Sequence, residues 1–480
     1  MEVTLINPPI SVSNPEVVSV LEINTPPMGL ASLAAPLEHA GYGVTIIDAP
    51  ILNLSFTQLG KQLAKKQPEV IGVTAMTPQI IDALRTISIA KKACPEAVTV
   101  LGGAHATFLP VKTLQSCSEL DVVCVGEGEQ TLLELVQTIE KNGRFSKIRG
   151  TYSRDNGRLI ENERRPPVSN LDDLPFPARH LLEMDKYRVL GKKIAIGAIL
   201  TSRGCPFRCA FCSSNRIFGK KFRARSPENV LDEIEQVITD YKPATIEFSD
   251  DLFTLNHKRV QDICKEFKKR GIDLPWACSS RVNTVSRTLL CEMKRAGCKL
   301  IFYGIESGSQ RILNAMHKGI TIEQIEKAIK WTNQARIDTY GAFILGWPGE
   351  TIQEINQTIA FAKKLDLDFS QFSIATPYPG TSLYDAVKEK GLLTTEDWTQ
   401  FTAGRPIFAT NQFSEKELRA LLRKAYKNFY LRSKFLIRQL KKRGVKSFLY
   451  LTRFVVGKSL QTFFTKNSSQ ISDEFANIED

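Results

Sequence analysis

The sequence lacks any long apolar run, since no segment reaches the roughly 18 uninterrupted apolar residues that a membrane-spanning helix needs. Its first residues, MEVTLINPPI, also lack the basic region and the apolar stretch of a secretory signal. These two absences predict a cytoplasmic protein. At 480 residues, with 42% apolar and 24% charged residues, the chain is too long for a single hydrophobic core. We expect two major domains and an appendage.

Cysteine is scarce as well. Ten cysteines in 480 residues are too few for a disulfide scaffold. Three of them lie within eight positions, a density that in a reducing compartment indicates metal ligation. The other seven have no clustered spacing, and we expect them to be buried as apolar packing. They are Cys94, Cys117, Cys124, Cys264, Cys278, Cys291 and Cys298.

A GxGxxG motif is missing after the first predicted strand, which argues against a nicotinamide or flavin site. Residues 1–145 nonetheless alternate short β-branched runs with helical patterns, as a doubly wound, Rossmann-like α/β domain requires. The expected strands are 3–7, 44–48, 70–75, 98–102 and 121–125. The expected helices are 30–40, 55–66, 78–93 and 129–142.

Three more segments follow this domain. Residues 146–190 contain a hairpin turn at 155–157 and a Pro-rich stretch, and we interpret them as an interdomain linker. The βα alternation resumes over 191–400 and predicts a partial (βα)6 barrel. Residues 401–480 are expected to form a basic amphipathic helical module with a disordered end. The expected barrel strands are 194–202, 244–249, 275–281, 299–306, 340–346 and 370–376.

The segment TSRGCPFRCAFCSS carries the strongest chemical signal. It places Cys205, Cys209 and Cys212 close enough for one loop to wrap a single cluster. Three thiolates leave one iron of a [4Fe-4S] cube without a protein ligand, and a chelating molecule can occupy that iron. A structural zinc site would need a fourth ligand nearby, but the next histidine and cysteine are His257 and Cys264. The pattern therefore favours an iron-sulfur cluster over zinc.

The CxxxCxxC spacing, with the aromatic Phe211 before the last cysteine, resembles the signature of radical S-adenosylmethionine (SAM) enzymes. The resemblance covers about residues 190–390. It implies a [4Fe-4S] cluster on the three cysteines, SAM on the open iron, and an electron from a reductant such as flavodoxin or ferredoxin. It also implies a 5′-deoxyadenosyl radical that abstracts hydrogen from an unactivated carbon.

Further matches to this family fall at the ends of later barrel strands, where βα barrels carry their chemistry. The resemblance implies that the acids of FSDDLF bind the SAM amino group, that the arginine of SSRVN holds a polar contact to SAM, and that the acid of YGIESGS contacts the ribose or the amino-acid part. In GAFILGWPGET it implies a backbone cradle for adenine. Helix caps for the aspartates and surface salt bridges for the other two charges are the alternatives. The residues are Asp250, Asp251, Arg281, Glu306, Ile344 and Gly346.

The N-terminal domain has glycine-rich turns at 102–103 and 126–128 and the segment TPPMGLASLAAPLEHAGY near its start. With these features it resembles the cobalamin-binding domain that precedes many radical SAM cores. Ligands of a doubly wound sheet bind at the carboxyl ends of its strands. The expected cofactor contacts at those ends are Asn7, Thr77, Gly102, Gly103, His105, Gly126 and Glu127.

The sequence departs from many cobalamin proteins in one respect. The DxHxxG loop that supplies a histidine to cobalt is absent after the first strand, so we do not expect that histidine on the lower cobalt face. His105 has an alternative as a hydrogen-bonded structural residue, and Glu127 has one as a first-turn helix acid.

Basic charge is concentrated near the C-terminus. Residues 416–466 contain fifteen lysines and arginines and a single acid, Glu417, in a chain of net charge +13. Basic and aromatic residues interleave there, and we expect peripheral contact with the inner face of the membrane. A solvated face that covers the barrel is the alternative. Nucleic acid is less favoured, because the extra cluster cysteines and terminal β-barrel of transfer-RNA methylthiotransferases are not visible.

These features together predict a cobalamin-binding radical SAM enzyme that methylates or cyclises a hydrophobic small molecule, with a membrane lipid or isoprenoid as the preferred substrate. It resembles the group that contains the anaerobic magnesium-protoporphyrin ester cyclase, hopanoid-modifying enzymes and tetraether ring synthases. The alternatives are a tetrapyrrole cyclase, an RNA-modifying enzyme and a non-catalytic cobalamin sensor.

Overall fold

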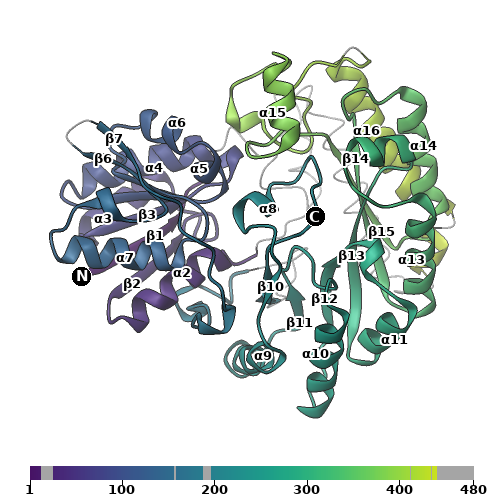
Figure 1. Cartoon of the computed structure of the whole chain (residues 1–480), viewed down its shortest axis with the longest axis horizontal. Coiled ribbons are helices and arrows are strands. Elements are labelled where there is room, and N and C mark those ends of the chain that lie inside the picture. The colour runs from purple at the N-terminus through teal and green to yellow at the C-terminus, as the bar shows by residue number, and fades with distance from the viewer. Residues whose placement is uncertain (12–24, 156–157, 188–195, 411, 434, 441–480) are drawn as a thin grey trace, which may run out of the picture.

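The computed structural model describes residues 1–480 except 12–24, 156–157, 188–195, 411, 434 and 441–480. Two α/β units lie side by side, and the loop that ends in helix α8 (Ser214–Ile217) lies between them (Figure 1). The predicted α/β fold, with a doubly wound domain followed by a partial barrel, is confirmed.

The N-terminal unit is built on a seven-stranded sheet of order β2-β1-β3-β4-β5-β6-β7. Its first five strands pair in parallel, and all five were expected from the sequence. They are β1 (Glu2–Asn7), β2 (Gly43–Asp48), β3 (Val70–Thr74), β4 (Val98–Gly102) and β5 (Val122–Cys124). The expected helices are also present as α2 (Met28–His39), α3 (Phe56–Lys66), α4 (Ile80–Ala93) and α7 (Glu129–Glu140). Two short helices, α5 (Ala104–Phe108) and α6 (Pro110–Gln115), were not expected.

The hairpin assigned to the linker belongs to this sheet instead. Strand β6 (Thr151–Asp155) pairs antiparallel with β5, and β7 (Arg158–Glu161) pairs with β6. The physical reason is that β5 would otherwise present unpaired backbone groups along an exposed edge. Tyr152 buries its ring in the core of the unit and holds the hairpin there. The connection between the two units is therefore shorter than 146–190.

The second unit holds six parallel strands in the order β15-β14-β13-β12-β11-β8. Neighbours in the sequence are neighbours in the sheet, which is the arrangement of a barrel left open between its first and last strands. The strands are β8 (Ile196–Ile199), β11 (Thr245–Phe248), β12 (Trp276–Ser280), β13 (Cys298–Glu306), β14 (Asp338–Leu345) and β15 (Phe369–Ile374).

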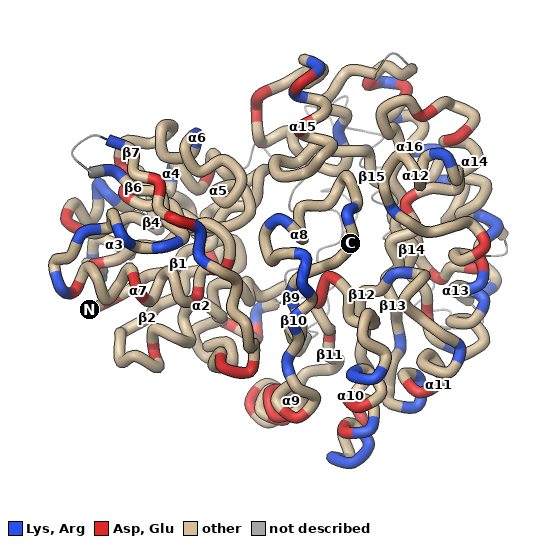
Figure 2. Tube along the Cα trace, in the orientation of Figure 1, with Lys and Arg blue, Asp and Glu red and all other residues tan. Residues whose placement is uncertain are grey.

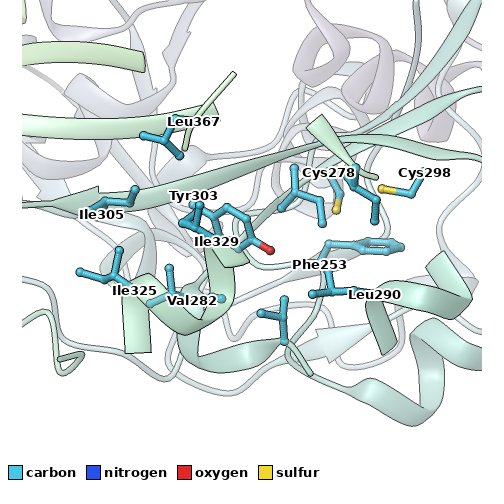
Figure 3. Packing of buried hydrophobic residues seen from close by; sticks show 14 of the residues in the cluster. Phe253, Cys278, Val282, Leu290, Cys298, Tyr303, Ile305, Ile325, Ile329 and Leu367 are labelled. Carbon is cyan, nitrogen blue, oxygen red and sulfur yellow. The ribbon is translucent and has the colours of Figure 1, made fainter. Parts of the chain in front are cut away.

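Helices cover the outside of this barrel (Figure 1). They are α9 (Pro227–Tyr241), α10 (His257–Lys269), α11 (Arg287–Arg295), α13 (Ile322–Gln334) and α14 (Ile352–Lys364). Figure 3 shows the core between strands and helices, with Tyr303, Ile305, Ile325 and Ile329 packed together.

All ten cysteines are free, and six of the seven outside the motif are buried, as predicted. Cys291 is partly exposed.

Helix α16 (Glu415–Tyr430) covers the open edge of the barrel. It buries Leu418, Ala425 and Phe429 against β15 and α14. The hydroxyls of Tyr426 and Tyr430 each accept from an N–H and donate to a C=O of β15. In this part of 416–466 the apolar face points to the barrel, as the alternative of a covering face predicts. Residues 441–466 lie outside the described residues.

No helix within the described ranges is long and apolar enough to cross a membrane. The chain after the barrel also returns to the N-terminal unit, because Trp398, Phe401 and Ile407 pack into that unit's core. The two units are thus joined by buried contacts as well as by the connecting segment.

Candidate functional site

The cysteine loop begins where the short strand β9 (Ser202–Arg203) ends. Gly204 turns the chain with φ +86°, and a Cβ atom on it would lie 2.3 Å from the carbonyl oxygen of Lys221. Only glycine fits this close approach. The loop then closes on itself through hydrogen bonds from Cys205 N to Gly219 O and from Cys212 N to Cys209 O.

The three thiols are close enough to influence one another. Burial raises the pKa of the Cys205 and Cys212 thiols, that of Cys212 to about 11, and neighbouring cysteines and Asp251 raise both further. Gathering thiols beside a carboxylate in this way disfavours thiolates unless a cation joins them. No three His, Cys, Asp or Glu side chains in the described ranges are placed to bind one metal ion. By their chemistry and their spacing along one loop, the three cysteines fit a [4Fe-4S] cluster, in which each thiolate binds a different iron.

The two adjacent aspartates of FSDDLF have different surroundings. Asp250 is buried, and its carboxylate accepts four hydrogen bonds of 2.5 to 3.1 Å from the backbone and hydroxyls of Thr201 and Ser202. It fixes the chain that leads into the cysteine loop. Asp251 accepts from the Ser214 hydroxyl, and desolvation raises the pKa of its carboxyl. Of the pair, Asp251 is the one placed beside the thiols.

Glu306 ends β13 in a strained conformation. Its φ is +69°, and the pairing with β14 shifts register at this point. The carboxylate forms a buried ion pair of 2.7 Å with Lys318, whose Nζ also lies 5.6 Å from the centre of the Phe211 ring. Lys318 was not predicted. Its only signal in the sequence is a lysine before a glycine after a short helix, which is common in loops.

The fifth strand brings Ile344 and Gly346 to the same region. Ile344 packs with Phe211 and Trp347 against one small apolar cluster, and Gly346 has φ +76°. Oε2 of Glu350 accepts from the N–H groups of Gly346 (2.7 Å) and Trp347 (3.0 Å). Glu350 therefore fixes the turn that follows the strand.

Arg281 follows β12 and points to the cysteine loop. Its Nη1 donates to Sγ of Cys209 at 3.2 Å, and its Nη2 donates to the carbonyl of Lys318. The resemblance implied a contact with SAM, whereas this guanidinium is held against a cysteine of the motif.

Residues at the carboxyl edge of the N-terminal sheet are held by hydrogen bonds. Asn7 donates to Asp48 at 2.8 Å, and Asp48 accepts from Tyr187 at the same distance. Thr77 is buried, and its hydroxyl lies 3.4 Å from Nδ1 of His105.

The glycine-rich turns at this edge bring backbone segments together. Gly102 ends β4, and Gly103, at φ +96°, passes so close to Ala75 that a Cβ would lie 2.6 Å from its carbonyl. Gly126, at φ +78°, donates its N–H to the hydroxyl of Thr107.

His105 is buried edge-on against Trp398, with 5.0 Å between ring centres. Burial and the neighbouring Lys112 lower its pKa to about 4, so the ring is neutral at physiological pH. These surroundings agree with the alternative that His105 is a hydrogen-bonded structural residue. A neutral imidazole also suits contact with an uncharged group.

Glu127 joins the two units. Its carboxylate accepts from Arg223 at 2.5 Å and from the backbone of Val168, and it lies 3.5 Å from Nη1 of Arg203. Arg203 also pairs with Glu129 at 2.5 Å. Figure 2 shows basic residues along β9 and β10 (Arg223–Ala224), between the units. Both oxygens of Glu127 are occupied, and its partner Arg203 lies two residues before Cys205.

Comparison with known proteins agrees with this two-part organisation. A model of the radical SAM superfamily matches residues 199–362, and a model of the B12 binding domain matches residues 16–136. An uncharacterised methyltransferase of Pyrococcus horikoshii is 41% identical over 92% of this chain and 95% of its own length. The anaerobic magnesium-protoporphyrin IX monomethyl ester cyclase of Rubrivivax gelatinosus is 32% identical over 86% of this chain and 75% of its own.

A solved structure shows the same fold. The cobalamin-dependent SAM radical enzyme OxsB, with aqua-cobalamin and SAM bound, superposes with a TM-score of 0.75 at 19% identity, covering 96% of this chain and 72% of OxsB. The chain therefore belongs to the cobalamin-binding radical SAM enzymes, a family of methyltransferases and cyclases, and its cofactors are a [4Fe-4S] cluster, SAM and cobalamin.

Proposed function

We propose that this enzyme methylates an unactivated carbon of a hydrophobic small molecule held between its two units. The supporting observation is the buried contact of Arg203 and Arg223 with Glu127, which ties the cysteine loop to the turn after β5. Ligands of a doubly wound sheet bind at that edge. Two cofactors would then face one substrate.

In this proposal Cys205, Cys209 and Cys212 bind the cluster, and Asp251 receives the amino group of SAM. Glu306 with Lys318 presents polar groups to the rest of SAM, and the backbone at Ile344 and Gly346 borders its adenine. When bound, the cluster and SAM supply a 5′-deoxyadenosyl radical, and cobalamin supplies the methyl group. The cobalamin contacts would be Asn7, Thr77, Gly102, Gly103, His105 and Gly126, with Glu127 as a positioning residue.

We propose a lipid or isoprenoid as the substrate and peripheral membrane contact through 416–466. Three large apolar side chains after α16 support this: Leu431, Ile437 and Leu440 are 50%, 54% and 40% exposed. They fall within ten residues of the sequence, and an exposed apolar patch there would suit contact with an apolar partner. A one-electron reductant such as flavodoxin or ferredoxin completes the system.

Lipid profiling of a host that expresses the chain tests the proposal. New methylated lipids should appear with the parent chain and disappear with Cys209→Ala, which should lose iron and SAM cleavage while keeping cobalamin. Cys291→Ala, at a partly exposed cysteine outside the motif, is the matched control and should keep all three properties. A Cys209→Ala protein that cleaves SAM at the parental rate would refute the proposed site.

Ring closure is a second candidate, favoured by the 32% identity with the magnesium-protoporphyrin cyclase. Mass spectrometry separates the two reactions, because methylation adds one carbon to the product whereas ring closure removes hydrogen and adds no carbon. If the products are cyclised and carry no added carbon, the proposed reaction becomes cyclisation and not methylation.

A further inference from the structure

The guanidinium of Arg281 is held rigidly against the cysteine loop. Its Cζ lies 3.7 Å from the ring centre of Phe207, which stands between Cys205 and Cys209 in the sequence. Its Nε donates to Oδ1 of Asn283 at 3.3 Å, and its Nη2 donates to the carbonyl of Lys318. These contacts leave Nη1 pointing at Sγ of Cys209, 3.2 Å away.

Arg281 is also a buried cation whose charge needs a partner. The residue is 6% exposed, and the ion pairs found among the described residues include none with Arg281. A buried charge is costly unless an anion lies nearby. An anion within its hydrogen-bonding reach is the sulfur of Cys209, once that sulfur is a thiolate.

Arg281 differs in this respect from the other arginines near the loop. Arg203 and Arg223 share the carboxylates of Glu127 and Glu129. Arg216, on α8, pairs with Asp385 at an exposed position. Their charges are therefore offset by carboxylates, whereas that of Arg281 is directed at the cysteine loop.

We propose that Arg281 tunes the reduction potential of the iron-sulfur cluster, in addition to any contact with SAM. The inference rests on the cluster assignment made above. Reduction adds one electron to a cluster whose thiolate Cys209 accepts a charged hydrogen bond. A fixed positive charge and a hydrogen bond to sulfur stabilise the reduced cluster more than the oxidised one. Arg281 thereby raises the potential and makes one-electron reduction by the external donor easier.

The test is an anaerobic redox titration of the reconstituted holoenzyme without SAM, followed by electron paramagnetic resonance. The variants form a graded series: Arg281→Lys keeps the charge, Arg281→Gln keeps a hydrogen-bond donor, and Arg281→Met keeps neither. We expect Arg281→Met to shift the oxidised-to-reduced equilibrium about tenfold toward the oxidised cluster, a fall of 59 mV for one electron. Lys and Gln should fall between Met and the parent. Arg216→Met, which removes an exposed and paired charge, should keep the parental potential.

Four outcomes decide the matter. Suppose that Arg281→Met holds a cluster at parental iron content and that its oxidised-to-reduced equilibrium stays within about twofold of the parental one. That result would overturn the inference and leave the proposed function standing. Weaker SAM binding with that unchanged potential would make Arg281 a SAM contact, as the family resemblance implied. If Arg281→Met binds no cluster, the test passes to Arg281→Gln and Arg281→Lys. The inference is then overturned unless the cluster of Arg281→Gln has a lower potential than that of Arg281→Lys. A parent chain that binds no cluster at all would instead refute the proposed function.

Discussion

At the residue scale, Glu350 is a buried carboxyl group through which we expect stability to depend on pH. Burial raises its pKa to about 7, although its Oε2 accepts two backbone hydrogen bonds. A raised pKa means that the folded protein favours the protonated acid, so the stabilisation is complete below the ordinary carboxyl pKa and is lost as pH rises toward 7. We expect the free energy of unfolding to decrease between about pH 5 and about pH 7 and to level off above.

Denaturant unfolding of the holoenzyme at several pH values measures this, and Glu350→Gln should flatten the slope. Asp262→Asn is the matched control, since its hydrogen bond with Lys258 lowers the pKa of the Asp262 carboxyl and Asp262 does not act on Glu350. The contribution of Asp262 is present above its ordinary pKa and is lost only in acid, so this variant should keep the parental slope. If the free energy of unfolding depends on pH equally in Glu350→Gln and in the parent, Glu350 is not the group responsible.

The same scale shows what the sequence can predict about the site. The cysteine loop and Phe211 could be predicted from the sequence because their spacing along the chain carries the chemistry. The different surroundings of Asp250 and Asp251 could not be read from the sequence, because both are aspartates and only the fold decides which one meets Thr201 and Ser202. Lys318 was missed for a similar reason, since its partner Glu306 comes from another element.

At the scale of elements, α16 protects the edge of an open barrel. Tyr426 and Tyr430 satisfy the N–H and C=O groups of Ser370 and Phe372 on β15. Removing either hydroxyl leaves partly buried backbone groups without a hydrogen-bond partner, which costs about 1 to 3 kcal/mol. We expect Tyr426→Phe and Tyr430→Phe each to destabilise the protein by about that amount in denaturant unfolding. Tyr42→Phe, which removes an exposed hydroxyl bonded to Glu140, should change stability by less than about 0.5 kcal/mol.

Combining the two substitutions supplies the decisive comparison. The double variant should expose the β15 edge and aggregate at lower temperature than either single variant. Three tyrosine variants with the same small effect would mean that α16 holds the barrel by apolar packing alone.

Strand periodicity predicted the parallel strands of both units, because buried β-branched runs alternate with amphipathic helices. The roles of two elements were not predicted. The hairpin β6–β7 looked like a linker because its partner β5 precedes it by a whole helix. The apolar side of α16 was assigned to membrane contact because β15, which it covers, comes from another part of the chain. The local sequence pattern predicts where strands and helices lie. Contacts between distant segments of the chain decide which element covers which.

At the scale of the whole molecule, a buried ion network holds the two units together. Glu127 and Glu129 belong to the first unit, and Arg203 and Arg223 belong to the second. Neutralising one partner of such a network leaves a buried charge without its counterion, which costs about 3 to 5 kcal/mol. We expect Glu127→Gln to destabilise the protein by about 3 kcal/mol in denaturant unfolding. Glu163→Gln, which breaks the exposed pair with Arg149, should cost less than about 1 kcal/mol.

Hydrogen exchange locates the effect of Glu127→Gln. The network lies two residues from Cys205 on one side and at the end of β5 on the other, so its loss should increase exchange in both 200–225 and 122–136. Local damage to the acidic turn would raise exchange in 122–136 only. Increased exchange confined to that range, with the cysteine loop as protected as in the parent, would show that the two units do not support each other through Glu127. Increased exchange in both ranges would mean that contacts with the cobalamin-binding unit hold the cysteine loop in place.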